Sequence, residues 1–288
     1  MNILNEETIS EKTFTAERAL FNVSRKTIVD CIFGEGESPL KESSHLTIRN
    51  CQFEWKYPLW YSHNIVVYNS IFNAMARAGI WYTDHISMKD CVVLAPKEFR
   101  RCKNMSLENV NFADAKETLW NCQHIDLKNV QVANGDYFAM NCSDMEIEKL
   151  SLCGNYAFDG AKNVVIRNSK LLTKDAFWNA ENITVYDSVI TGEYFGWNSR
   201  NIKLVNCTIE SLQGFCYMDN IILENCKLLN TTLAFEYSSN INADVLTNID
   251  SVANPISGLI TCHGIKELIN NEFHKGNNDN VEIIETGK

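Results

Sequence analysis

Residues 64–72 read NIVVYNSIF, and this pattern decides the fold. It returns as NIKLVNCTI at residues 201–209 and as NIILENCKL at residues 220–228. In each copy, apolar and polar residues alternate on both sides of a central Asn. This alternation predicts two short β-strands joined by a turn.

The pattern recurs along most of the chain at intervals of about 20 residues, and a fixed period of this length predicts a solenoid. The turn position is occupied by Asp30, Asn50, Asn69, Asp90, Asn109, Asn129, Lys149, Asn168, Asp187, Asn206 and Asn225. Asn tolerates the left-handed backbone of a sharp corner, and stacked Asn amides can hydrogen-bond to one another. Lys149 interrupts the column, and we expect it to turn outward.

A third inward column indicates a third strand in each repeat. Its members are Leu59, Ile80, Phe99, Leu119, Phe158, Phe177, Phe215 and Phe235. Three strands per repeat, stacked about 4.8 Å apart, predict an all-β parallel β-helix of about a dozen coils. We expect one domain over residues 1–275 with an irregular N-terminal cap. A polar C-terminal tail is expected over residues 276–288.

Composition excludes several classes of function. The formal net charge of −10 argues against nucleic acid or an anionic membrane as a partner. We see no signal peptide and no run of about 18 apolar residues. The eleven cysteines fall mainly in columns of small inward residues, which predicts reduced thiols and a cytoplasmic protein without disulfides. No Cys-x-x-Cys pair or phosphate-binding loop occurs, so we expect no metal and no cofactor.

Several phrases resemble those of a bacterial domain-of-unknown-function family of right-handed parallel β-helix proteins with the pectate-lyase-like superfold. The phrases are residues 17–20, 57–60, 156–159, 175–179, 192–197 and 254–258. The resemblance implies a right-handed coil, and it implies no activity or catalytic residue. The superfold includes polysaccharide lyases, hydrolases and binding proteins, so fold alone cannot choose among these functions.

An aromatic column follows the third inward column by one residue and is expected on the outer face. It contains Trp60, Trp81, Arg100, Trp120, Trp178 and Trp197. With Tyr194, these residues are the predicted substrate-binding set, because sugar rings pack on aromatic faces. Two alternatives remain open. Loops could cover the rings, or the row could bind protein as a non-catalytic interaction platform, with a second copy of the chain as one candidate partner.

Three acids lie beside one end of this column. Asp159, Asp175 and Glu193 come from consecutive repeats, and the last two are expected near the same corner. Neighbouring carboxyl groups can perform the acid–base chemistry of glycosidic bonds, so these three are the predicted catalytic residues. Ordinary solvated acids at a corner are the alternative. The sequence therefore favours a carbohydrate-binding or carbohydrate-acting protein and leaves open whether it is an enzyme.

The histidines offer a weaker signal. His45, His85 and His124 occupy a corner that is Asn in other repeats, which favours a role in the turn over a role in catalysis.

Overall fold

The computed structural model describes residues 7–271 and 280–287, and no α-helix occurs among them. It therefore contains no helix of the length and apolar character needed to span a membrane in this described part of the chain. The chain divides into two compact units, Met1–Met145 and Glu146–Lys288. Each is a parallel β-solenoid, so the predicted all-β parallel β-helix is confirmed.

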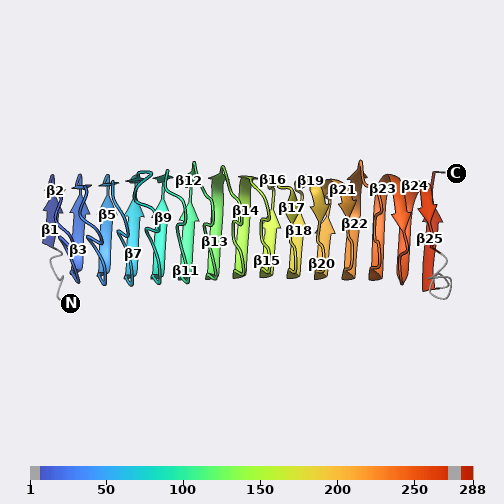
Figure 1. The fold of residues 1–288 in the computed structure, drawn as a ribbon, viewed down its shortest axis with the longest axis horizontal. Helices are drawn as coiled ribbons and strands as arrows, with labels where there is room; N and C mark the ends of the chain where they lie inside the picture. The colour runs from blue at the N-terminus through green and yellow to red at the C-terminus, as the bar shows by residue number, and fades with distance from the viewer. Residues whose placement is uncertain (1–6, 272–279, 288) are drawn as a thin grey trace, which may run out of the picture. The chain divides into compact units, whose positions relative to one another are not determined.

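Long and short strands alternate in the first unit (Figure 1). The strands are β1 (Glu7–Ser10), β2 (Thr13–Phe14), β3 (Ser24–Val29), β4 (Ile32–Phe33), β5 (Ser44–Arg49), β6 (Gln52–Phe53), β7 (His63–Tyr68), β8 (Ile71–Phe72), β9 (Asp84–Lys89), β10 (Val92–Val93), β11 (Lys103–Glu108), β12 (Asn111–Phe112) and β13 (Gln123–Val132).

The second unit continues the same pattern with longer strands near its end. Its strands are β14 (Ser143–Cys153, of which residues 146–153 belong to this unit), β15 (Lys162–Arg167), β16 (Lys170–Leu172), β17 (Asp175–Ala176), β18 (Glu181–Tyr186), β19 (Val189–Phe195), β20 (Arg200–Val205), β21 (Thr208–Gly214), β22 (Asp219–Leu229), β23 (Ser239–Ala253), β24 (Gly258–Ile269) and β25 (Val281–Glu285).

Equivalent residues of successive coils pair in parallel and in register. In the first unit Ile65 of β7 pairs with Ile86 of β9. In the second unit Ile183 of β18 pairs with Ile202 of β20. Because the side-chain period of a strand is two, this register places each inward column inside its unit. The core of both units is therefore a stack of like residues.

The corner after each long strand is left-handed, as the Asn column predicted. Asn50 and Asn109 have φ of 53° and 54°. Asn109 also donates from Nδ2 to Asp90 Oδ1 at 2.8 Å. Lys149 keeps the left-handed backbone with φ of 57° and is exposed, so its predicted outward orientation is confirmed. Glu148 replaces Lys149 as the acceptor for the next residue of the Asn column, and Asn168 donates to its Oε1 at 3.0 Å.

The third side of each coil differs from the other two. Phe99 and Phe177 of this side are fully buried, as predicted, but both have positive φ. Much of the side is joined by isolated bridges, such as the one between Trp81 and Arg100, and few of its residues form continuous strands. Left-handed residues interrupt the extended backbone that continuous pairing needs. This irregular side carries the aromatic column.

The chain ends are more regular than the sequence predicted. In the region expected to be an irregular cap, β1 pairs in parallel with β3 and β2 pairs with β4. In the expected polar tail, β25 pairs with β24, and its apolar residues include Val281 and Ile283. The remaining parts of these predictions, at residues 1–6, 276–279 and 288, lie outside the described residues.

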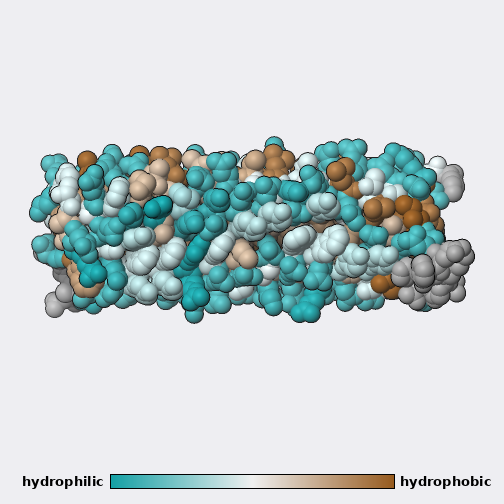
Figure 2. Space-filling model, in the orientation of Figure 1, coloured by the Kyte–Doolittle hydropathy of each residue, from teal (hydrophilic) through white to brown (hydrophobic). Residues whose placement is uncertain are grey.

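Outward positions are mostly polar, as strand alternation predicts. Figure 2 shows a largely hydrophilic surface, with hydrophobic side chains gathered over β23 and β24 in the second unit. Leu246 of β23 and Leu268 of β24 are 47% and 48% exposed.

Candidate functional site

A pocket of about 350 Å³ lies on the third side of the second unit. Its lining residues are Tyr156, Lys174, Asp175, Trp178, Tyr194, Trp197 and Gln213. Four of them, Asp175, Trp178, Tyr194 and Trp197, are among the site residues predicted from the sequence. The volume is at the lower end of the range of about 300–1,000 Å³ that is typical of small-molecule sites.

Successive coils deliver these side chains to one place. Asp175 of β17 pairs in register with Tyr194 of β19, which pairs with Gln213 of β21. Tyr156 lies 19 positions before Asp175, at the same interval that separates Asp175 from Tyr194 and Tyr194 from Gln213. Tyr156 and Gln213 were missed as site residues. Both could have been found from the sequence, because Tyr156 lies one coil before Asp175 and Gln213 lies one coil after Tyr194.

A close backbone contact positions Asp175. The Lys174 carbonyl accepts from the N–H groups of both Glu193 and Tyr194, each at 2.9 Å. Gly192 makes the approach feasible, because a Cβ atom there would lie 1.9 Å from the Thr173 carbonyl oxygen. Strand pairing is interrupted between β16 and β17 at this point. Irregularities of this kind re-aim side chains beside functional sites.

The Asp175 carboxyl is the most unusual group in the pocket. The residue is only 2% exposed, and its Oδ1 has no hydrogen-bond partner among the described residues. Burial raises the pKa of Asp175. The Glu193 charge adds to this increase, and the Lys174 charge opposes it. Asp175 therefore keeps its proton to a higher pH than a solvated aspartate does.

The Trp178 indole provides a matching unsatisfied donor. Its Nε1 is buried and has no partner in the described part of the chain. The surrounding rings are tilted against one another. Trp178 lies 5.8 Å from Tyr156 and 6.4 Å from Trp197, with interplanar angles of 55° in both cases. Tyr194 meets Trp197 edge-on at 6.5 Å. The aromatic walls of the pocket are thus not stacked face to face.

An ion pair lies beside the pocket. Lys174 Nζ is 3.7 Å from Glu193 Oε2, and both side chains are substantially exposed. The Glu193 charge is the largest cause of a raised pKa for Lys174. Glu193 is therefore engaged by a cation, and its charge also acts on Asp175.

Asp159, the third predicted catalytic acid, belongs to a corner ladder. Its Oδ1 accepts from Asn179 Nδ2 at 3.2 Å, and Asn179 Oδ1 accepts from Asn198 at 2.9 Å. The same arrangement supports other corners, so this contact accounts for Asp159 structurally. Of the three predicted acids, only Asp175 lines the pocket. The Glu193 charge acts on Asp175 from beside the pocket, and Asp159 belongs to the corner ladder.

The aromatic column of the first unit forms a closed stack. Trp60 and Trp81 are parallel within 8°, with ring centroids 5.2 Å apart. The Arg100 guanidinium carbon lies 4.7 Å from the Trp81 centroid and 4.3 Å from the Trp120 centroid. Such cation–π contacts stabilise a stack but cover the ring faces that a sugar would need.

The polar atoms of this stack are also largely paired. The indole N–H groups of Trp60, Trp81 and Trp120 donate to the backbone carbonyls of Ala78, Lys97 and Tyr137. Arg100 donates from Nη2 to Glu117 Oε2 at 2.8 Å. The predicted substrate-binding residues therefore divide between a stack in the first unit and a pocket in the second. All five of these tryptophans are half-buried.

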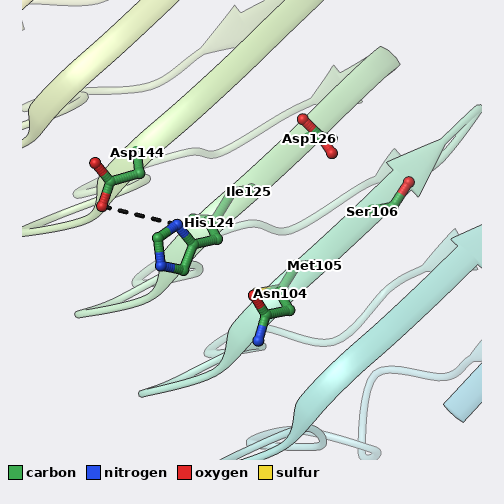
Figure 3. Close-up of a pocket in the computed structure, with 7 residues that line it drawn as sticks. All are labelled: Asn104, Met105, Ser106, His124, Ile125, Asp126 and Asp144. Carbon is green, nitrogen blue, oxygen red and sulfur yellow. Dashed lines mark ion pairs between the residues drawn. The ribbon is translucent and has the colours of Figure 1, made fainter. Parts of the chain in front are cut away.

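A second, polar depression of about 400 Å³ lies on the first unit (Figure 3). The His124 ring points toward Asp144, with Nδ1 3.9 Å from Oδ2. His124 has φ of 55°, and its neighbour in the column, Asn104, donates to Asp84 Oδ1 at 2.8 Å. His45 and His85 also have left-handed φ, so the predicted turn role of these histidines is confirmed.

Metal ligation finds no support in the geometry. Within residues 7–271 and 280–287, no group of three or more His, Cys, Asp or Glu side chains is placed to hold a metal ion.

Fold and pocket together define a parallel β-helix protein with an aromatic-walled pocket. The chain belongs to the family described as "Protein of unknown function (DUF3737)", whose model matches residues 7–284. This confirms the predicted membership of a domain-of-unknown-function family of β-helix proteins. None of the curated proteins compared with the chain matches it.

Solved structures with a similar fold are distant in sequence. The AlgE6 A-module of the Azotobacter vinelandii mannuronan C-5 epimerase is 11% identical with a TM-score of 0.45, covering 98% of this chain and 90% of that chain. The Streptococcus pneumoniae surface adhesin PfbA is 9% identical with a TM-score of 0.38, covering 92% and 81%. The tailspike protein of E. coli bacteriophage HK620, in complex with a hexasaccharide, is 10% identical with a TM-score of 0.31, covering 91% and 56%. Similarities this low carry no argument about function.

Proposed function

We propose that the pocket of the second unit binds a carbohydrate. The proposal is carried by two unsatisfied polar atoms, Asp175 Oδ1 and Trp178 Nε1, for which the described residues provide no partner. A buried donor or acceptor left unpaired costs about 1–3 kcal/mol, so a ligand that satisfies both gains this free energy. A hydroxyl group both donates and accepts, so sugar hydroxyls suit a pocket whose lining offers one acceptor and one donor.

The aromatic walls support the same ligand class. Trp178, Trp197, Tyr156 and Tyr194 present apolar surface around the two polar atoms. Sugar rings have apolar C–H faces and a polar rim, and aromatic rings pack against such faces while a few placed polar groups fix orientation. A purely apolar ligand would leave Asp175 unsatisfied.

The test is a glycan array probed with the full chain, followed by titration of the sugar that binds best. Asp175→Asn should weaken binding about 10- to 100-fold, because it replaces an acceptor oxygen bonded to the sugar with an amide that is half donor. Trp178→Phe should weaken binding about 3- to 10-fold, because it removes the N–H donor. Trp55→Phe, in the first unit, is the control and should bind like the wild type. Variants that fold and bind normally, or an array with no positive sugar, would refute the proposal.

A second candidate is turnover of the bound sugar, and the proximity of two carboxyl groups favours it. The Glu193 charge contributes to the raised pKa of Asp175, and the two carboxyl groups differ in environment, because Asp175 is buried while Glu193 is exposed beside Lys174. Acid–base catalysis on glycosidic bonds uses such a pair. In a polysaccharide degradation screen, Asp175→Asn and Glu193→Gln should each lower turnover by about 100-fold or more. Full turnover in both folded variants would exclude catalysis at this site.

A further inference from the structure

The charges around the pocket indicate which carbohydrates it can accept. Lys174 is the only cationic side chain among its described lining residues. Its Nζ is already 3.7 Å from Glu193 Oε2. We propose that the pocket selects uncharged sugars and rejects acidic ones, an inference that rests on the proposed carbohydrate-binding function.

The surrounding acids strengthen this selection. Asp175 lies in the wall of the pocket, and Glu193 lies at its edge beside Lys174. Gln213, which also lines the pocket, donates from Nε2 to Glu236 Oε2 at 3.0 Å. An incoming carboxylate would thus meet up to three acids and one cation. It would also have to separate Lys174 from Glu193, and close like charges disfavour binding.

Arg200, another cation of the second unit, is engaged elsewhere. Arg200 Nη2 lies 2.9 Å from Glu181 Oε2, and Glu181 also pairs with Lys162 at 3.2 Å. Arg200 is therefore held in an exposed ion-pair cluster of its own. A neutral hydroxyl ligand needs no cation, because Asp175 and Trp178 supply the acceptor and the donor.

The experiment compares ligands that differ only in charge. Gluco-, galacto- and manno-configured oligosaccharides are titrated beside their C6-oxidised counterparts, in which each CH₂OH is a carboxylate. The wild type should bind the neutral member of a pair at least about 10-fold more tightly. Glu193→Gln frees Lys174 and removes one acid, so the preference for the neutral member should fall by about 10-fold or more. Glu224→Gln is the matched control, because Glu224 also pairs with a lysine, Lys203, and is equally exposed. This control should keep the wild-type preference.

The outcomes separate the two proposals. If uronates bind at least as well as neutral sugars, and Asp175→Asn or Trp178→Phe weakens that binding, the site is correct and the charge selection is wrong. An unchanged preference in Glu193→Gln would also overturn the charge selection. If no oligosaccharide binds, or if binding is insensitive to all pocket variants, the proposed function fails and this inference fails with it.

Discussion

A single buried carboxyl group, Glu98, is the least expected side chain in the core of the first unit. It is 0% exposed, and its Oε1 accepts from the Gly79 N–H at 3.1 Å. Its Oε2 has no partner among the described residues. Burial raises the pKa of Glu98 well above its ordinary value, against the smaller effect of the backbone N–H groups of Gly79 and Ile80. Folding therefore takes up a proton at this residue wherever the unfolded chain has lost it.

We predict that Glu98→Gln reduces the loss of stability at rising pH. In the wild type, the unfolded carboxyl ionises above about pH 4.3 while the folded one stays protonated, so the free energy of unfolding falls as pH rises toward the folded pKa. The slope from this residue is at most about 1.4 kcal/mol per pH unit. In urea unfolding between pH 5 and 8, the free energy of unfolding of Glu98→Gln should rise relative to that of the wild type by up to this amount for each pH unit. The exposed Glu54→Gln is the control, and a gap between Glu98→Gln and wild type that does not change with pH would contradict the prediction.

Corner residues show what sequence alone can predict at this scale. Every Asn or Asp of the turn column has a left-handed φ, because few other side chains tolerate it without loss. The direction of the ladders was not predicted. Asn50 donates to Asp30 and Asn69 donates to Asn50, so the ladder begins at an acid. A carboxylate can only accept a hydrogen bond, so an Asp in an Asn column fixes the direction of the ladder. In other solenoids this direction could be predicted from the sequence.

At the scale of the strand, one glycine supports the pocket. Gly192 of β19 lies against the Thr173 carbonyl. Two residues further along each coil, Tyr194 pairs in register with Asp175, so this contact lies beside the pocket residues. A Cβ atom at Gly192 would be 1.9 Å from that oxygen. A backbone atom cannot yield as a flexible side chain does, so the two coils must separate locally.

Gly192→Ala should therefore lower the free energy of unfolding by about 1–3 kcal/mol, which is the usual range for overpacking. It should also weaken sugar binding at the pocket. Thermal unfolding followed by circular dichroism measures the first effect, and titration measures the second. Gly34→Ala is the matched control, because its Cβ atom would have its nearest contact at 3.4 Å, with Thr15 Cγ2. An unchanged unfolding temperature in Gly192→Ala would show that the close contact is not needed.

On the third side of the coil, sequence periodicity predicts which residues are buried but not their backbone conformation. Alternation identified Phe99 and Phe177 as inward residues, and both are fully buried. It could not reveal that both have left-handed backbone, because a buried Phe gives no conformational signal of the kind that Asn gives. The orientation of residues following such positions depends on this backbone. Asp175 was identified by its neighbours in sequence, but its burial was not predicted.

At the scale of the whole molecule, one sequence column serves two physical purposes. Arg100 lies between Trp81 and Trp120 in the first unit, whereas the Trp178 and Trp197 rings of the second unit lie 6.4 Å apart and are tilted by 55°. The sequence placed all of these residues in one row. Only contacts between coils distinguish a closed stack from an open pocket. The candidate site could thus be located from the sequence, but its boundary could not.

The cysteines are distributed over both units, so their reactivity depends on the packing of the whole chain. All eleven are free, and ten are buried, while Cys153 is exposed. Burial raises the pKa of Cys51 to about 11 and that of Cys216 to about 12, so their thiolates are scarce at pH 8. The thiolate is the reactive species, so a buried thiol reacts only after local opening of its coil exposes it to solvent.

We predict that DTNB at pH 8 modifies one thiol quickly in the native protein and the remaining ten slowly. Cys153→Ser should remove the fast phase and leave the slow phase unchanged, because the other thiols depend on opening of the solenoid and not on access at residue 153. Denaturation without reductant should release all eleven thiols at once. Fewer than eleven would mean that disulfides form in the native protein, and the inference of a reducing compartment would then be wrong. Several fast thiols with all eleven recovered would instead mean that the coils open more readily than their burial indicates.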